Sequence, residues 1–235
     1  MPRLRADISG KRLRALIEAA LVVFCRQGFE RSQVADVAKA MGVAVGTVYL
    51  YVESKEALFD LVVRHTYQES PAWLDELEVP VRTPAPGSTV EYLSGVFGRA
   101  NQWPVLAAAL KARRADDPRR ELEGVVLEQY GLMKRYRMGL LLLRRSALEF
   151  PGLSEVFVLG LRQKLLTQLV RYIDARVAGG QFRAPANTLA TAAVITQTIS
   201  WANLQRPFDP GLQELSEEEV ERATVDMLIE GLVTN

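Results

Sequence analysis

Apolar residues recur at helical spacing along almost the whole chain, with polar residues at the positions between them. This period is typical of helices that bury one face, and no sustained segment alternates in the manner of a half-buried strand. The pattern therefore predicts an all-α fold. The first helix is expected to begin near Ser9, a candidate cap, and to stop at Gly28, with an inner face of Leu13, Leu16, Ile17, Ala20 and Phe24.

Two short helices are expected directly after the first one, joined by a tight corner at Gly42. Ser32 is the predicted N-cap of the earlier helix, and Gly42 supplies the positive backbone angle that ends it. The later helix is predicted from about Ala44 to Val52. Because such short helices are marginal in water, both must pack on the longer helix before them. This arrangement is typical of a helix-turn-helix, whose second helix lies in the major groove of DNA.

Helical periodicity continues from Ser54, which is expected to open a further helix, to the end of the chain. Prolines and a glycine accumulate between residues 71 and 88, a composition typical of a loop near a domain boundary. Ser216 and Glu219 have the spacing of a capping box at the start of the last helix. After the loop, helices are expected near residues 88–101, 103–115, 118–150, 154–178, 187–204 and 216–232.

The overall charge is nearly balanced, with 29 lysine and arginine residues against 28 acidic ones, and 49% of the residues are hydrophobic. These values are typical of a globular protein. Because the chain has neither an apolar run of membrane-spanning length nor the apolar core of a secretory signal, we expect a cytoplasmic protein with no membrane partner. Basic residues exceed acidic ones before residue 15, which suits a phosphate backbone, although a solvated tail explains the excess as well.

The sequence lacks the common motifs of catalysis. It contains neither a P-loop nor the G-x-G-x-x-G or H-E-x-x-H patterns, and Cys25 and His65 are its single cysteine and histidine. These counts exclude the common zinc sets, so we expect no metal and no cofactor. We predict that the protein is not an enzyme. The enzymatic alternative is an active site made of carboxylates alone. Cys25 is interpreted as a small buried hydrophobe rather than a redox sensor.

An ordered run of motif residues lies between Arg14 and Leu61: Ala19-Ala20, Phe24, Gly28-Phe29, Ser32, Val37-Ala38, Met41-Gly42-Val43, Gly46-Thr47-Val48-Tyr49, Tyr51 and Ser54-Lys55-Glu56-Ala57-Leu58. With this run, roughly a fifth of the chain resembles the DNA-binding domain of the TetR/AcrR family of transcriptional regulators. The resemblance implies a three-helix helix-turn-helix DNA-binding domain, expected over residues 9–53, and a helical ligand-binding and dimerisation domain over residues 54–235. It also implies a ligand-responsive regulator, a repressor that a small apolar or aromatic effector releases from double-stranded operator DNA.

The predicted recognition helix begins with small residues, which would let its backbone approach the edges of the bases. Hydroxyls follow on its later turn, and Lys55 places an ammonium at the start of the next helix, where it would hold a phosphate. In the family that the segment resembles, these positions contact the DNA backbone. Tyr49 is expected to be more buried than Tyr51. The predicted DNA-binding residues are Ser32, Gln33, Ala44, Val45, Gly46, Thr47, Tyr49, Tyr51 and Lys55.

Three positions depart from the pattern of the family. Gln33 stands where threonine is common, Ala44 where a serine cap is common, and Val52 where phenylalanine is usual. The missing serine cap costs about 1 kcal/mol of helix stability. Gln33 offers a polar contact of its own to DNA, so the operator sequence does not carry over from the family.

Specific binding by a helix-turn-helix normally uses two half-sites, which predicts a homodimer. In the proteins that this chain resembles, two C-terminal helices pair with their copies as a four-helix bundle. The helices expected at residues 154–178 and 187–204 carry apolar and small residues at helical spacing, although these faces could instead pack inside one subunit. The predicted dimer interface consists of Phe157, Leu161, Leu165, Leu169, Tyr172, Ala192, Ala193, Thr196 and Ile199.

The long helix from Glu121 carries an apolar stripe with a methionine, tyrosines and one amide. Such a stripe is more often core than pocket, but methionine and tyrosine also line adaptable apolar pockets. We find no buried-charge pattern that points to an anionic or sugar ligand, and by analogy with the family we expect an aromatic, lipidic or cationic effector. The predicted ligand-binding residues are Trp103, Gln129, Tyr130, Met133 and Tyr136.

Two other functions remain compatible with these features. A helical adaptor that has lost DNA binding would use the helix-turn-helix for protein contacts, which the hydroxyls and Lys55 argue against. An activator would bind DNA through the same surface, because the sequence does not reveal where the operator lies relative to a promoter.

Overall fold

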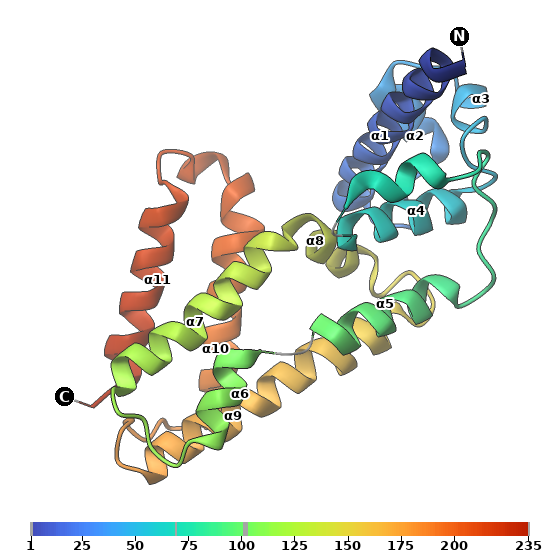
Figure 1. Cartoon of the computed structure of the whole chain (residues 1–235). Helices are drawn as coiled ribbons and strands as arrows, with labels where there is room; N and C mark the ends of the chain where they lie inside the picture. The colour runs from blue at the N-terminus through green and yellow to red at the C-terminus, as the bar shows by residue number, and fades with distance from the viewer. Residues whose placement is uncertain (1, 69, 101–102, 235) are drawn as a thin grey trace. The chain divides into compact units, whose positions relative to one another are not determined.

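The computed structural model describes residues 2–68, 70–100 and 103–234, and the chain folds into helices joined by short loops (Figure 1). The predicted all-α fold class is confirmed. Among the described residues, β pairing is limited to isolated bridges between Val52 and Val81 and between Phe182 and Val233. Two compact units make up the chain: the first contains residues 1–98 and 138–157, and the second contains residues 99–137 and 158–235.

The packing of the chain differs from the functional division expected at residues 53 and 54. Residues 54–98 and 138–157 belong to the same compact unit as the helix-turn-helix. The assignment of DNA binding to residues 9–53, and of ligand binding and dimerisation to residues 54–235, stays a prediction.

The N-terminal helices of the first unit are arranged around one apolar core. Helix α1 begins at Pro2 rather than near the predicted cap Ser9, and it ends before Gly28, whose φ of 83° requires a residue without a side chain. Its inner face packs on both α2 and α4, as the periodicity predicts. These elements are α1 (Pro2–Gln27), α2 (Val34–Met41), α3 (Val45–Val48) and α4 (Lys55–Tyr67), and their core includes Leu16, Ile17, Phe24, Val37, Val48, Leu58 and Leu61.

The proline-rich stretch after α4 lies inside the first unit rather than between the units, contrary to its interpretation as a boundary loop. It contains the 3₁₀ helix η1 (Pro71–Glu76) and then an extended segment at Val81. The Val81 amide donates to the Tyr51 carbonyl at 2.7 Å, and the Glu53 amide donates to the Val81 carbonyl at 3.0 Å. The loop is therefore fastened to the residues that follow α3, and it leads into α5 (Ser88–Ala100).

The helix predicted at residues 118–150 is broken at Tyr136, where the backbone angles φ −102° and ψ 20° leave the helical region. The two parts are α7 (Pro118–Arg135), in the second unit, and α8 (Arg137–Ser146), almost all of which lies in the first. Phe150, after α8, packs its ring on Phe29 and Phe59 with centroid distances of 4.9 and 4.8 Å. Sequence periodicity alone did not predict this break or the packing of Phe150.

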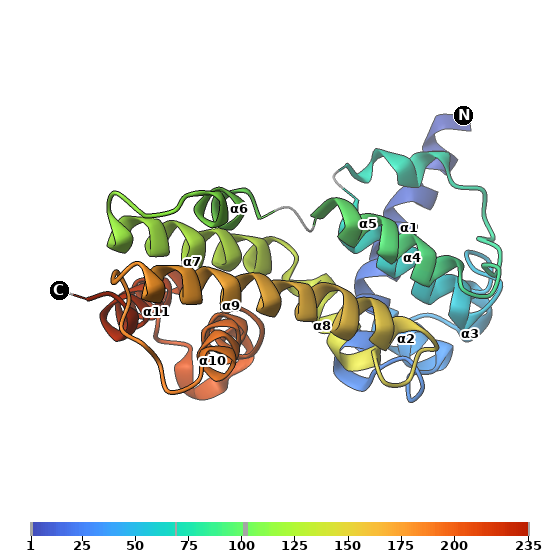
Figure 2. The same ribbon diagram turned by 90° about the horizontal axis from the view of Figure 1, so that it is seen from below.

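The helices of the second unit surround a separate apolar cluster (Figures 1 and 2). Helix α7 contacts α6, α10 and α11, and α9 contacts α6 and α10. The segments predicted at 154–178 and 187–204 each include a π-helical part, which periodicity does not reveal. The elements are α6 (Pro104–Lys111), α7, the π-helix η2 (Glu155–Arg162), α9 (Gln163–Ala178), α10 (Thr188–Ser200), the π-helix η3 (Trp201–Gln205), the 3₁₀ helices η4 (Arg206–Phe208) and η5 (Pro210–Leu212), and α11 (Glu217–Leu232).

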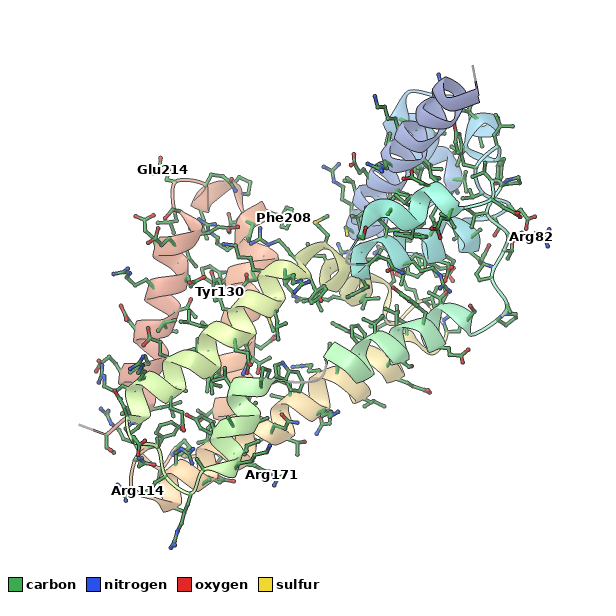
Figure 3. All side chains as sticks on the ribbon, viewed as in Figure 1. Arg82, Arg114, Tyr130, Arg171, Phe208 and Glu214 are labelled. Carbon is green, nitrogen blue, oxygen red and sulfur yellow. The ribbon has the colours of Figure 1, made fainter. Side chains whose placement is uncertain are left out.

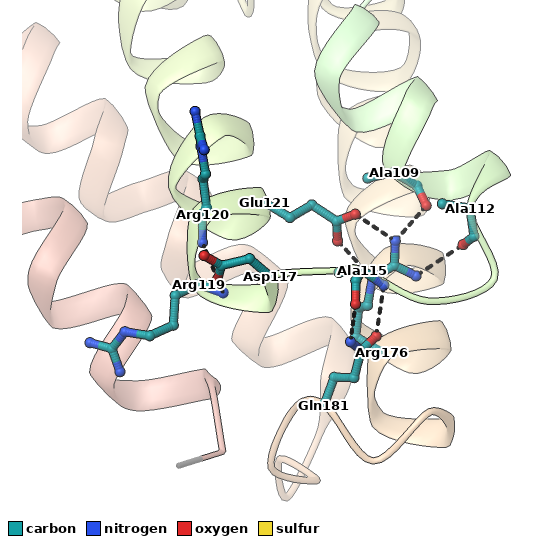
Figure 4. Close-up of polar contacts among 9 residues, drawn as sticks. All are labelled: Ala109, Ala112, Ala115, Asp117, Arg119, Arg120, Glu121, Arg176 and Gln181. Atoms are coloured by element: carbon teal, nitrogen blue, oxygen red, sulfur yellow. Dashed lines mark hydrogen bonds and ion pairs between the residues drawn. The ribbon is translucent and has the colours of Figure 1, made fainter.

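A buried ion pair fixes the end of this cluster (Figure 4). Arg176, which is completely buried, donates from Nε and Nη2 to the Glu121 carboxylate at 2.7 and 2.9 Å. Its Nη2 also donates to the carbonyl of Ala109 in the last turn of α6 at 2.6 Å, and its Nη1 donates to the carbonyl of Ala112, just after α6, at 3.2 Å. Because nearly every donor of the guanidinium has a partner, the charge is compensated. Arg176 thus joins α9, α7 and the end of α6.

Candidate nucleic-acid interface

The corner of the predicted helix-turn-helix forms as the sequence indicates. Gly42 ends α2 with φ 68° and donates its amide to the Lys39 carbonyl at 3.1 Å. Ala44 then precedes α3 with extended backbone and no side-chain cap, so the missing serine cap is a feature of the structure. The α-helical part of α3 is shorter than predicted, and hydrogen-bonded turns continue the chain to Val52.

The outer side of α3 presents backbone with little side-chain cover. Ala44, Val45 and Gly46 are exposed, and the space around the Gly46 Cα is open. Val48 points the other way and is buried, which anchors α3 to the core. A short helix with one anchored side and one bare side can approach the edges of bases closely.

The two tyrosines at the end of α3 and just after it differ in burial from the prediction. Tyr49 is 47% exposed, whereas Tyr51 is half-buried, so the predicted order of burial is wrong. Thr47 is also half-buried. Leu50 is 67% exposed, and its place between two tyrosines in the motif was the one signal that could have added it to the candidate surface.

Ser32 does not cap α2 as predicted. Its hydroxyl is buried and donates to the Gly28 carbonyl at 2.6 Å, while Gln33 occupies the cap position. The Gln33 amide donates to the Asp36 carboxylate at 2.8 Å, which is the backward half of a capping box. Ser32 therefore closes the turn after α1, and exposed Gln33 is the polar side chain at this end of α2.

Lys55 has a structural role that the sequence did not indicate. Its ammonium donates to the carbonyls of Phe29 and Glu30 at 3.1 and 3.4 Å and lies 4.3 Å from the centroid of the Phe29 ring. Ser54 caps α4 as predicted, because its hydroxyl accepts from the Ala57 amide at 3.0 Å. Two of the three ammonium protons of Lys55 are thus engaged, and the third is the one left for a phosphate.

A further basic residue stands beside this surface. Arg82 is exposed on the loop that pairs with Tyr51 and Glu53, and its side chain extends away from the ribbon (Figure 3). The Thr83 hydroxyl is 2.7 Å from that of Ser54, and the Thr83 amide donates to the Glu53 carboxylate at 2.9 Å. Sequence reasoning missed Arg82 because the loop was interpreted as a boundary segment.

The comparisons with known proteins agree with this geometry. Residues 16–62, which span α1 to α4, match the sequence profile described as bacterial regulatory proteins, tetR family. This segment is therefore similar to that family, and the match does not extend to the rest of the chain. The fold of the remainder is supported by the structure of the ketosteroid transcriptional regulator KstR2 of Mycobacterium tuberculosis, which superposes with a TM-score of 0.55 at 17% identity and covers 95% of this chain and 96% of that one.

Two curated relatives come from Bacillus subtilis strain 168. The HTH-type transcriptional regulator YfiR is 35% identical over 32% of this chain and 37% of its own length. The fatty acid metabolism regulator protein is 33% identical over 30% of this chain and 34% of its own length. The matches thus span about a third of the relatives. Both are named as regulators rather than enzymes, which agrees with the absence of catalytic motifs.

Most of the predicted ligand-binding residues lie on or next to α7, and Trp103 directly precedes α6. Trp103, Gln129 and Tyr130 are buried, whereas Met133 and Tyr136 are half-buried. Burial raises the pKa of the Tyr130 phenol above its ordinary value, and nearby Glu221 and Glu217 raise it further. Their role in ligand binding stays a prediction.

The predicted dimer interface stays a prediction. Leu165, Leu169 and Tyr172 on α9, and Ala192, Thr196 and Ile199 on α10, are buried inside the second unit. Phe157, Leu161 and Ala193 are half-buried and stay predictions. Periodicity identified the apolar faces but not which neighbour covers them. Exposed apolar residues in this part of the unit are Leu189 and Val194 on α10, Trp201 at the start of η3, and Met227 on α11.

Cys25 and His65 lie in the first unit. Cys25 was expected to be a small buried hydrophobe and is half-buried, and burial raises the pKa of its thiol to about 12, which favours the unreactive protonated form. Burial also lowers the pKa of His65. Among the described residues there is no group of histidine, cysteine, aspartate and glutamate arranged for a metal ion. No helix in the described part of the chain is long and apolar enough to cross a membrane.

Proposed function

We propose that the chain is a ligand-responsive transcriptional regulator, a repressor that a small apolar or aromatic effector releases from double-stranded operator DNA. The observation that carries the proposal is the bare outer side of α3 at Ala44, Val45 and Gly46, held by buried Val48. Tyr49, Thr47 and Tyr51 supply hydroxyls beside it. This pattern favours a surface that reads base edges and grips the flanking phosphates.

The proposed regulator acts as a homodimer through the exposed apolar face of α10 and α11. Val194 is 60% exposed, Met227 is 55% exposed and Trp201 is 39% exposed, although each is a large apolar residue. A shallow groove of about 600 Å³ lies between the two helices, and Val194 and Met227 are among the residues that line it. Exposed apolar groups of this kind favour a protein partner, and the two half-sites of an operator make a second copy of the chain the fitting one.

The dimer is tested by light scattering after gel filtration. Val194→Asp places a charge in the proposed interface and is expected to yield monomers, whereas the wild type yields dimers. Leu148→Asp is the control, because Leu148 is 93% exposed and lies in the first unit. A dimeric V194D protein would place the interface elsewhere.

Release by the effector follows from population shift. A ligand that binds the second unit more tightly in one state of the dimer increases the population of that state. If the two helix-turn-helix domains are spaced differently in that state, they no longer fit two half-sites of the operator. The chain passes from the second unit to the first at the break by Tyr136.

DNA reading is tested by fluorescence anisotropy with labelled DNA from the region beside the protein's own gene. Val45→Ala and Leu50→Ala are expected to change the preference among operator variants, while Leu148→Ala leaves it unchanged. A mismatched base contact costs about 1–3 kcal/mol, enough to reorder the variants. Identical preferences in V45A, L50A and wild type would contradict a reading surface on α3.

A further inference from the structure

A buried arginine at the start of η4 has no ion-pair partner among the described residues. Arg206 is only 6% exposed, and its Nε and Nη2 atoms have no hydrogen-bond partner among the described residues. Arginine keeps its charge in proteins, so burial does not neutralise it. A buried guanidinium whose donors lack partners destabilises the folded state unless an anion binds to it. Arg176, the other deeply buried arginine of this unit, shows the contrast, because its donors meet Glu121 and two carbonyls.

Two buried amides are unsatisfied in the same unit. Gln129 on α7 is 2% exposed, and neither its Nε2 nor its Oε1 has a partner among the described residues. Asn203 on η3 is fully buried; its Nδ2 donates to the Ile199 carbonyl at 3.0 Å, whereas its Oδ1 has no partner. Buried amides are normally satisfied, so each is a candidate for a ligand contact.

The two buried amides lie on helices, α7 and η3, that contribute residues to the same apolar cluster. Gln129 follows Val125 and Val126 by one helical turn, and Asn203 follows Ile199 by one turn, so each shares a helix face with core residues. Helix α7 packs on η3, and η3 is continuous with η4, which begins at Arg206. Asn203 also lies in a π-helical turn, a feature frequent at functional sites.

Two carboxylates in the first turn of α11 are already engaged. Glu217 accepts from Arg137 and Lys134 at 2.7 and 2.8 Å. The Glu219 carboxylate accepts from the amide and hydroxyl of Ser216 at 2.8 and 2.7 Å. Arg206 lies close enough to Glu219 to favour its charged form, but no hydrogen bond joins the two.

We propose that the second unit binds a small amphiphilic carboxylic acid, with its carboxylate on Arg206 and its apolar body in the cluster around α7 and α10. The Nε and Nη2 donors of Arg206 match the two oxygens of a carboxylate. Gln129 and Asn203 supply further polar contacts. This inference rests on the proposed function in that the acid is its effector, and it replaces the expectation of a ligand without an anionic group.

The test compares matched acids and alcohols by isothermal titration calorimetry on the full-length protein without DNA. The probes are octanoate with octan-1-ol, dodecanoate with dodecan-1-ol, and 3-phenylpropanoate with 3-phenylpropan-1-ol. For at least one pair, the acid is expected to bind about tenfold or more tightly than the alcohol, the range for hydrogen bonds to charged groups. Equal affinities in every pair, or no binding of any acid, would overturn the proposal.

Arg206→Met is expected to abolish the preference for the acid. Because it removes an unpaired buried charge, it should also leave the melting temperature of the unliganded protein unchanged or raise it, whereas loss of a structural arginine would lower it. Arg171→Met, on the exposed side of α9, is the control and retains the preference. If R206M does not fold, Gln129→Leu serves instead and is expected to weaken acid binding about tenfold. An acid preference that survives in folded R206M, or an acid affinity that is unchanged in Q129L, contradicts the site.

The same samples separate this inference from the proposed function. The preferred acid is added to the protein bound to operator DNA, and anisotropy reports release. Acid binding without release would contradict the effector role and leave the site intact. DNA binding by a protein that takes up none of the acids would contradict the site and leave the regulator intact.

Discussion

The ring of Phe150 stacks on the ring of Phe59 at a centroid distance of 4.8 Å and an interplanar angle of 24°. Phe59 lies on α4, and Phe150 comes from the segment that follows α8, far along the chain. Phe29 and Phe24 continue the aromatic group towards the end of α1. The helix-turn-helix is therefore stabilised by a segment outside the part of the sequence that resembles the family.

Phe150→Ala is expected to destabilise the protein. Because Phe150 is half-buried in an aromatic group, its loss should lower the free energy of unfolding by about 2–3 kcal/mol, somewhat below the value for a fully buried phenylalanine. Urea unfolding followed by circular dichroism measures the change. Leu148→Ala, two residues away and 93% exposed, is the control and should differ from wild type by under about 0.5 kcal/mol. Equal losses in both variants would mean that the ring stacking adds nothing.

Arg176→Ala is expected to be far more damaging than loss of an exposed arginine. It leaves Glu121 and two carbonyls without their donor inside the second unit, which costs about 3–5 kcal/mol. Arg119→Ala removes an exposed ion pair with Glu230, which solvent screens, and should change the free energy of unfolding far less. Thermal unfolding compares the two. An R176A protein with the same melting temperature as R119A would refute the structural role of the buried pair.

Glu217 is expected to contribute to the acid sensitivity of the second unit. Hydrogen bonds from Lys134 and Arg137 lower the pKa of its carboxyl from 4.5 to about 2. Since the folded state holds this proton more weakly than the unfolded state, the stabilisation is complete above pH 4.5 and is lost as the pH falls towards 2.

Glu217→Gln should therefore lose less stability than wild type across that window. Urea midpoints measured at its two ends give the comparison, with Glu218→Gln, the exposed neighbour, as the control. Parallel curves for E217Q and wild type would contradict the assigned pKa.

Lys55 and Arg82 should respond differently when each is changed to alanine. Arg82 is exposed, so R82A should leave the melting temperature unchanged and reduce the salt dependence of DNA binding by about one phosphate contact. K55A removes the donor to Phe29 and Glu30, so it should lower the melting temperature as well as the salt dependence. Anisotropy across a salt series and thermal unfolding separate the two effects. If the salt dependence of DNA affinity is unchanged in K55A, Lys55 does not contact a phosphate. The same result in R82A would exclude a phosphate contact by Arg82.

Local signals in the sequence determine much of the first unit. Gly28 and Gly42 end their helices, Ser54 caps α4, and the inner face of α1 is buried as its spacing predicts. Each of these features depends on neighbours within a few residues, so the sequence contains the needed information. The predicted cap role of Ser32 was wrong because its hydroxyl has two possible local partners, the start of α2 and the Gly28 carbonyl. It donates to the Gly28 carbonyl.

Features that depend on distant partners were not predictable from periodicity. Tyr172 and Ile199 have the same spacing whether a copy of the chain or their own unit covers them, and their own unit does. Arg206 and Arg176 look alike in sequence, and the availability of Glu121 is what distinguishes a compensated charge from an uncompensated one. Arg82 lies beside the candidate DNA surface because its loop pairs with Tyr51, and no local sequence signal predicted this pairing.

Footprinting on DNA from the region beside the gene, with excess unrelated competitor present, tests whether a dimer reads two half-sites through α3. A dimer should give a competitor-resistant footprint of two symmetric half-sites centred about one helical turn, or a multiple of it, apart. A footprint that competitor abolishes, or protection of a single half-site, would contradict reading by a dimer.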